Sequence, residues 1–328
     1  MSDNVDSNQF RCTYCGQRNQ ISEGRALDAA RCGRCRLPYS ATPHKKFAQL
    51  SPDTYIHPQD SQALAALHAI PGVDTVLKKL IELTGESYLR VMANANTVRV
   101  GPNQYPDLDA KLEIVCCTLG VPKPDLYVTV TDPIFGTGMG FNAMTTGVEK
   151  PFIIGYSSLL ERLDDKEILA VLAHEVGHIH AEHMLYTTAA RLLAALTEYL
   201  LMSNPISATL GLIVNMTIRV ALINWYQKAE LSCDRAALVV VQDTSVIVSA
   251  MLKLAGGLMA GRTVNHEAFV EQAREFDKKY EERMVDKFWT IIAASGRTHP
   301  FPVWRVAEIL KWVEAGEYDA VMARADAS

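Results

Sequence analysis

The sequence lacks several features that would place a chain in a special class. Its first ten residues, MSDNVDSNQF, contain neither the basic start nor the apolar core of a secretory signal. There is no internal repeat and no low-complexity tract. The formal net charge of -5 is modest, which argues against a dedicated nucleic-acid-binding protein. With no export signal, we expect a reducing compartment and a cytoplasmic location.

The composition that remains is typical of a globular protein. A chain of 328 residues suffices for one large domain or two ordinary ones, and an apolar fraction of 48% is enough to form a core. The charge is uneven along the chain, because residues 1–50 carry eight Lys or Arg against four Asp or Glu. The basic N-terminus could bind an acidic protein, nucleic acid or an anionic lipid, although a solvated basic surface is the favoured explanation.

Four of the seven cysteines form two C-x-x-C pairs near the N-terminus. Two such pairs separated by sixteen residues have the spacing of a structural zinc site, in which four thiolates leave no open position for catalysis. A redox role is the alternative, but no thioredoxin-like βαβ pattern follows. We therefore predict a structural zinc ion held by Cys12, Cys15, Cys32 and Cys35.

Turn residues and periodicity divide the chain into a zinc ribbon over 10–40, a polar linker over 41–60 and a main domain over 61–320. The main domain is predicted to be helical at first, to contain a few short strands in its middle, and to be helical again from Asp164. This pattern indicates an α+β fold, mostly helical with one small sheet. The expected helices cover 61–93, broken at Pro71-Gly72, and 107–119, and the expected strands cover 126–130, 140–146 and 151–155.

The segment His174-Glu175-Val176-Gly177-His178 matches H-E-x-x-H and lies in a predicted helix that begins at Asp164 and runs to about Leu185. Two histidines four residues apart differ by about 40° around a helix, so both can reach one metal ion. Glu175 is rotated away from them and is placed to take a proton from a metal-bound water. His180 and His183 point away from this face, and we expect structural or solvent-facing roles for them.

A catalytic zinc ion takes three protein ligands and keeps one open position. The candidate third ligand is Glu230, which stands four residues before Asp234 on an expected helix. One of these carboxylates can bind the metal while the other orients a ligand histidine. Cys233 lies beside them as a small buried residue or, alternatively, as a sensor of oxidation, and Cys116 and Cys117 are expected in the core.

Two apolar stretches within 187–224, separated by Ser203-Asn204-Pro205, predict a helical hairpin between the metal ligands. The second stretch is barely long enough to span a membrane, and both stretches contain charged residues, Arg191 among them. We expect a buried or membrane-peripheral hairpin, with a span of an inner membrane as the alternative.

Three ordered motifs resemble the HtpX-like, CAAX-prenyl-protease-like and Oma-like zinc metallopeptidases. They are HEVGHIHAEH (174–183), AELSCDRAAL (229–238) and THPFPVWR (298–305). The resemblance covers about residues 65–315 and implies a gluzincin, an endopeptidase whose third zinc ligand is a glutamate. The N-terminal unit is similar to the short zinc ribbon that precedes some bacterial thioredoxins.

The resemblance implies a role for each matching residue. His174, His178 and Glu230 would bind the catalytic zinc, Glu175 would be the general base, and Asp234 would hydrogen-bond a ligand histidine.

The same resemblance extends to the substrate. Asn142, Ala143 and Met144 would form an edge strand that pairs with an extended polypeptide, and His299, followed by Arg305, would lie near the zinc and stabilise the oxyanion. A protease active in protein quality control is the expected function. The alternative is a chaperone or adaptor that binds peptides with latent proteolysis.

Overall fold

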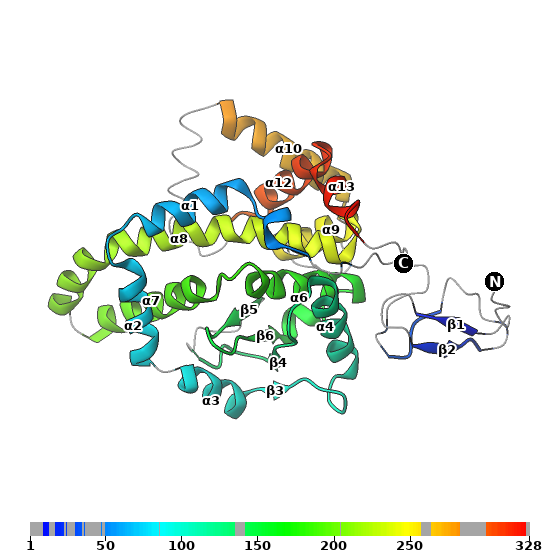
Figure 1. The fold of residues 1–328 in the computed structure, drawn as a ribbon, viewed down its shortest axis with the longest axis horizontal. Helices are drawn as coiled ribbons and strands as arrows, with labels where there is room; N and C mark the ends of the chain where they lie inside the picture. Colours follow the sequence, from blue (N-terminus) through cyan, green and yellow to red (C-terminus); the bar gives the residue numbers. More distant parts are fainter. Residues whose placement is uncertain are drawn as a thin grey trace.

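Helices dominate the computed structural model, and a four-stranded sheet lies against them (Figure 1). The structure describes residues 9–12, 17–22, 24, 30–34, 36, 47, 50–84, 86–134, 142–203, 205–256, 264–282 and 300–325; the side chains of 83–84, 194–217 and 279–282 are not described. The helices are α1 (Pro58–His68), α2 (Val73–Thr84), α3 (Glu86–Asn96), α4 (Pro106–Leu119), α5 (Ser157–Leu160), α6 (Asp165–His180), α7 (Met184–Ser203), α8 (Pro205–Val241), α9 (Thr244–Gly256), α10 (His266–Glu282), α12 (Pro302–Glu314) and α13 (Glu317–Met322). The α+β, mostly helical fold class is therefore confirmed.

The strands form two separate sheets. A short antiparallel pair near the N-terminus consists of β1 (Gln9–Arg11) and β2 (Arg18–Gln20). The larger sheet has the order β3-β4-β6-β5, in which β4 and β6 are parallel and the other neighbours antiparallel. Its strands are β3 (Val98–Arg99), β4 (Asp125–Thr129), β5 (Ala143–Thr146) and β6 (Phe152–Tyr156). The three strands expected from the sequence are thus all present, and β5 lies at an edge.

Local signals explain where the helices begin and end. Asp164 accepts hydrogen bonds from the backbone nitrogens of Lys166 and Glu167, both at 2.9 Å, while the Glu167 carboxylate accepts one from Asp164 N. This is the predicted capping box of α6. α4 ends at Gly120, whose φ of 71° is a conformation that glycine adopts without strain. The break predicted at Pro71-Gly72 separates α1 from α2.

The long helix α8 organises the main domain. It runs across the molecule, with α1 along one side and α6, α7 and the sheet on the other (Figure 1). α6 and α8 approach closely at Gly177, where a Cβ atom would lie 3.0 Å from the Cβ of Ala236. This contact needs a residue without a side chain, and it brings the two helices that carry the expected metal ligands together.

The predicted hairpin is present as α7, which ends at Ser203, and α8, which begins at Pro205. Its second arm is continuous with the helix that carries Glu230. Among the residues that the structure describes, no helix combines the length and the apolar composition needed to cross a membrane.

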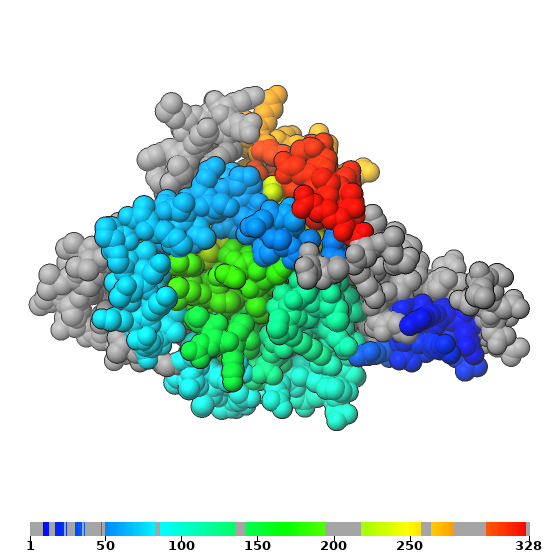
Figure 2. All heavy atoms as spheres, in the orientation of Figure 1, coloured from blue at the N-terminus to red at the C-terminus, as the bar shows by residue number. Residues whose placement is uncertain are grey.

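The residues before the main domain fall into two groups. The β1–β2 hairpin lies at one end of the molecule (Figure 2). By contrast, the chain from Leu50 onward packs into the main domain, where Tyr55, His57 and Asp60 are buried. The predicted linker, 41–60, lies partly outside the described residues, and its last part is built into the core because these side chains find partners there.

Candidate metal centre

His174 and His178 lie one turn apart on α6 and both are buried. Their Nε2 atoms face the same carboxylate of α8: His174 Nε2 is 3.4 Å from Glu230 Oε2, and His178 Nε2 is 3.3 Å from Glu230 Oε1. Two ligands of one tetrahedral zinc ion, each at 2.0–2.1 Å, stand about 3.3–3.4 Å apart. The histidine–glutamate spacings and the N, N, O donor set therefore fit a zinc ion.

Cys233 approaches the same pair of histidines. Ligand atoms of His174, His178 and Cys233 lie within 4.8 Å of one another, so these residues fit a metal site by distance alone. The Cys233 thiol is fully buried, and burial followed by the nearby carboxylates raises its pKa well above the ordinary range. The Cys233 sulfur lies 3.8 Å from His183 Nδ1, whereas the Glu230 carboxylate lies against the Nε2 atoms of His174 and His178.

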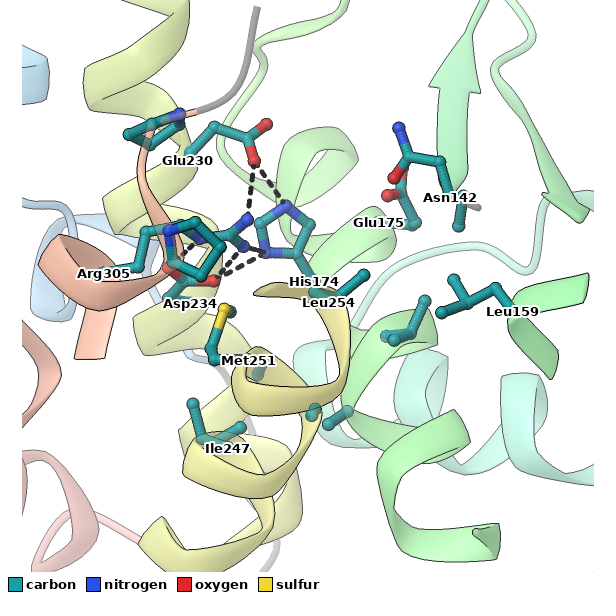
Figure 3. A pocket seen from close by; sticks show the side chains of 17 residues that line it. Asn142, Leu159, His174, Glu175, Glu230, Asp234, Ile247, Met251, Leu254 and Arg305 are labelled. Carbon is teal, nitrogen blue, oxygen red and sulfur yellow. Dashed lines mark hydrogen bonds and ion pairs between the residues drawn. The ribbon is translucent and has the colours of Figure 1, made fainter. Parts of the chain in front are cut away.

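Asp234, one turn after Glu230 on α8, contacts the first histidine. Its Oδ1 is 3.0 Å from His174 Nδ1, and Arg305 on α12 donates from Nε to Asp234 Oδ2 at 2.7 Å (Figure 3). Burial disfavours charge here, but the Arg305 guanidinium outweighs it and lowers the pKa of Asp234. Burial likewise opposes protonation of His174, yet Glu230 and Asp234 together raise its pKa to about 10. The surroundings of His174 thus favour a positive charge.

Glu175 is buried on the same helix and is held by the sheet. Thr145 in β5 donates a hydrogen bond from its hydroxyl to Glu175 Oε2 at 2.6 Å. Arg191 on α7 in turn donates to the carbonyl oxygen of Thr145 and, at 2.9 Å, to the hydroxyl of Tyr226. Tyr226 stacks on His178 with ring centroids 6.0 Å apart. Thr145 and Tyr226 were not predicted from the sequence, and Arg191 was expected only as a charge that disfavours a membrane span.

The turn after α6 differs from the expectation. The helix ends at His180 rather than near Leu185, because Glu182 adopts a left-handed conformation with φ of 57°. This turn brings His183 back beside the metal centre, with its Nδ1 3.3 Å from His178 Nδ1. The prediction that His183 points away from His178 was therefore wrong, although its structural role was anticipated. His180 lies at 2.7 Å from the hydroxyl of Tyr55.

His174 and Glu175 line a cavity of about 230 Å³. Asn142 and Ala143 line one side of it, at the start of the edge strand β5 (Figure 3). The rest of its wall is mainly apolar and includes Leu159, Ala170, Val171, Ala237, Ile247, Ala250, Met251 and Leu254. Glu230 lines this cavity and Cys233 does not.

Three predicted residues have no place in this description. His299, Cys15 and Cys35 lie outside the described residues. Pro300, which follows His299, is buried and lines the cavity. Met144 lies in β5 but does not line the cavity, whereas Cys12 and Cys32 are both buried in the N-terminal unit.

The chain is similar to known proteins over most of its length. It is 36% identical over 299 residues to the plastoglobule-localized metallopeptidase 48, chloroplastic, of Arabidopsis thaliana. This alignment covers 89% of this chain and 82% of the relative. It is 25% identical over 180 residues to protease HtpX homolog 2 of Methanosarcina mazei, covering 48% of this chain and 58% of the relative. It is 36% identical over 83 residues to the protease HtpX homolog of Tropheryma whipplei, covering 25% of this chain and 26% of the relative.

No solved structure was found to match the chain. The model of peptidase family M48 matches residues 102–313, which include both ligand helices and Arg305. This segment is well over half of the chain, and the Arabidopsis relative extends the similarity beyond it. The chain therefore belongs to peptidase family M48 and is a metalloprotease.

Proposed function

We propose that the protein is a zinc-dependent endopeptidase whose catalytic ion is held by His174, His178 and Glu230. The observation that carries this proposal is the approach of both Nε2 atoms to one Glu230 carboxylate at 3.3–3.4 Å. A ligand set built on Glu230 faces the cavity, as a hydrolytic site with an open position requires. Cys233 is the less suitable third ligand, because its thiol is fully buried and does not line the cavity.

A zinc ion held by these residues would supply Lewis acidity and would lower the pKa of a bound water molecule. Glu175 acts as the general base, and the proton that it accepts passes to the leaving amine nitrogen. The Thr145 hydroxyl donates to Glu175 Oε2, so Oε1 is the oxygen proposed to accept the proton. Asp234 and Arg305 hold His174 in place.

The substrate is proposed to be an extended polypeptide that adds a strand to the open edge of β5, next to Asn142, Ala143 and Met144. β6 pairs with the other edge of β5. A bulky apolar side chain of the substrate would then enter the cavity between α9 and Leu159. His299 is proposed to stabilise the oxyanion, and this role remains a prediction.

The test is an unbiased peptide-cleavage profile with zinc counts on the wild type, Glu175→Gln and His174→Ala. We expect Glu175→Gln to keep its zinc and to lose about 10²- to 10⁴-fold in activity. His174→Ala is expected to lose one zinc and all activity. A bulky apolar residue should be enriched at one position beside the cleaved bond. Full activity in Glu175→Gln would contradict the mechanism.

The second candidate function is a peptide-binding chaperone or adaptor, since an edge strand beside an apolar cavity also suits binding without cleavage. It predicts that Glu175→Gln and the wild type protect an unfolded client equally well. The general base and the ligands have no use in pure binding, so the enzyme is the favoured function, with protein quality control as its setting.

A second, structural zinc ion is proposed for the N-terminal unit. Cys12 directly follows β1, Cys32 is buried, and Asn19 Nδ2 lies 3.6 Å from the sulfur of Cys32. An N–H group directed at sulfur is expected where a thiolate binds a metal. Cys15 and Cys35 complete the proposed set. Deleting the unit should lower the zinc count by one.

The location and further partners are proposals of the same kind. We propose a cytoplasmic enzyme that contacts a membrane peripherally through 187–224. The basic ribbon would add an acidic protein or anionic lipid as partner, although two of its arginines, Arg31 and Arg34, meet acidic residues of the main domain. The name of the Arabidopsis relative places that protein at plastoglobules. Extraction at high pH and salt would release a peripheral protein and leave a spanning one in the membrane.

A further inference from the structure

A series of buried, contacting side chains begins at His178 Nδ1, on the opposite side of the ring from Glu230. His178 Nδ1 lies 3.3 Å from His183 Nδ1, and His183 Nε2 lies 3.2 Å from Asp60 Oδ2. The side chains of all three residues are at most 3% exposed. Side chains with so little exposed surface need buried hydrogen-bond partners for their polar atoms.

The positions of the protons in this series of side chains follow from its geometry. A histidine that faces a metal through Nε2 carries its proton on Nδ1. The Nδ1–H of His178 then donates to His183 Nδ1, and the remaining proton of His183 lies on Nε2, where it donates to Asp60. This is the one arrangement of neutral imidazoles that satisfies both contacts with His178 bound through Nε2.

Asp60 is itself held in place. The Ser232 hydroxyl on α8 donates to Asp60 Oδ2 at 2.5 Å, and the backbone nitrogen of His57 donates to the Ser232 hydroxyl at 3.0 Å. Asp60 belongs to the first turn of α1, which precedes the segment that the family model matches. A carboxylate from outside that segment therefore supports the metal centre.

The two ligand histidines are thus supported in different ways. His174 contacts Asp234 directly at 3.0 Å, and Arg305 fixes that carboxylate. His178 reaches its carboxylate only through a second histidine. An imidazole that donates to a fixed acceptor keeps the correct tautomer and becomes a better electron donor to its metal.

We propose that His183 and Asp60 are positioning residues for His178, which fix its tautomer and its ring so that the metal is bound more tightly. This inference rests on the proposed function, in which His178 is a zinc ligand. It assigns to α1 a part in metal binding in addition to its packing against α8.

The test is zinc affinity of the full-length protein, measured by competition with a chromophoric chelator. His183→Leu removes the acceptor for His178 and is expected to lose about 10- to 100-fold in affinity. His183→Asn places an amide oxygen near the position of Nδ1, and it should recover most of that loss. The absorption spectrum of the cobalt-substituted protein should shift in His183→Leu and return toward the wild type in His183→Asn.

His180→Leu is the matched control, because His180 ends the same helix, is half-buried, and contacts Tyr55 rather than a ligand. It should leave zinc affinity unchanged. The N-terminal cysteines are identical in all variants, so a difference between variants belongs to the histidine site.

Unchanged affinity and an unchanged cobalt spectrum in His183→Leu would overturn the proposal. Should that variant fail to fold, Asp60→Asn decides, since it keeps the shape and removes the charge: a weaker zinc site supports the proposal and an unaltered one overturns it. A wild-type protein that binds no zinc through His174 and His178 would instead contradict the proposed function itself.

Discussion

Two of the segments that precede the part matched by the family model, residues 50–60 and the N-terminal unit, are attached to the main domain in different ways. In residues 50–60, the side chains of Leu50, Tyr55, His57 and Asp60 are buried: His57 Nε2 lies 3.0 Å from Glu308 Oε2, and Asp60 contacts both Ser232 and His183. Cys12 and Cys32 of the N-terminal unit belong to the buried apolar cluster of the main domain, but the ion pairs between the two parts, Arg31 with Asp165 and Arg34 with Glu113, contain arginines that are about half exposed.

Because of this difference, we expect residues 50–60 and the N-terminal unit to depend on the main domain to different degrees for their stability. Removing one partner of a buried pair leaves an uncompensated group and costs about 3–5 kcal/mol, whereas an exposed pair contributes about 0–1 kcal/mol. Residues 50–60 should therefore belong to the catalytic domain energetically. The ribbon should be a separate unit that depends on its own metal, as small modules with little core usually do.

The largest expected effect comes from two deletions that separate these parts. Removing residues 1–46 should leave a folded, active peptidase with one zinc ion fewer. Removing residues 1–60 also takes away Tyr55, His57 and Asp60, and the loss of several buried contacts should exceed a total stability of about 5–15 kcal/mol. Thermal unfolding followed by circular dichroism measures both. Cooperative unfolding of the shorter protein at the wild-type temperature would contradict the comparison.

An intermediate effect is expected at Glu308, the partner of His57. Burial raises the pKa of this carboxyl, but the hydrogen bond with His57 and the charge of Lys311 outweigh it and bring the pKa to about 2, from 4.5. A lowered folded-state pKa stabilises the protein fully above 4.5, and this contribution is lost as the pH falls toward 2. Its upper limit is about 3 kcal/mol.

Glu308→Gln should therefore lower the free energy of unfolding at pH 7 by about 1–3 kcal/mol. Urea titrations at pH 5 and pH 4 should give a smaller difference between variant and wild type at pH 4, where the carboxylate begins to take up a proton in the unfolded state. A difference that grows from pH 5 to pH 4 would mean that Glu308 does not stabilise the protein as a carboxylate.

Much of the fold could be predicted because its signals are local. The capping box of α6, the break at Pro71-Gly72 and the end of α4 at Gly120 each depend on residues a few positions apart. The H-E-x-x-H spacing likewise defines one face of one helix. Glu230 could be proposed as a ligand because it stands four residues before Asp234 in the motif AELSCDRAAL.

The support of the metal centre could not be predicted, since it depends on contacts between distant segments. Asp60 and His183 are more than 120 residues apart, and they meet only because Glu182 turns the chain. Thr145 gave no signal, as a threonine in a strand is ordinary. Arg191 did give one, a charge within an apolar stretch, but its partner was a buried carbonyl group rather than lipid headgroups.

The smallest expected effect is at the surface between the ribbon and the main domain. The double variant Arg31→Ala, Arg34→Ala removes both exposed ion pairs and should lower the free energy of unfolding of the main domain by less than about 1 kcal/mol. The loss should shrink as salt is raised from 0.01 to 1 M, because the Debye length falls from about 30 to 3 Å. Arg274→Ala, which removes an exposed pair with Glu314 inside the main domain, is the control. An effect several times that of the control, or one that salt does not reduce, would show that the ribbon is coupled to the catalytic domain as firmly as residues 50–60.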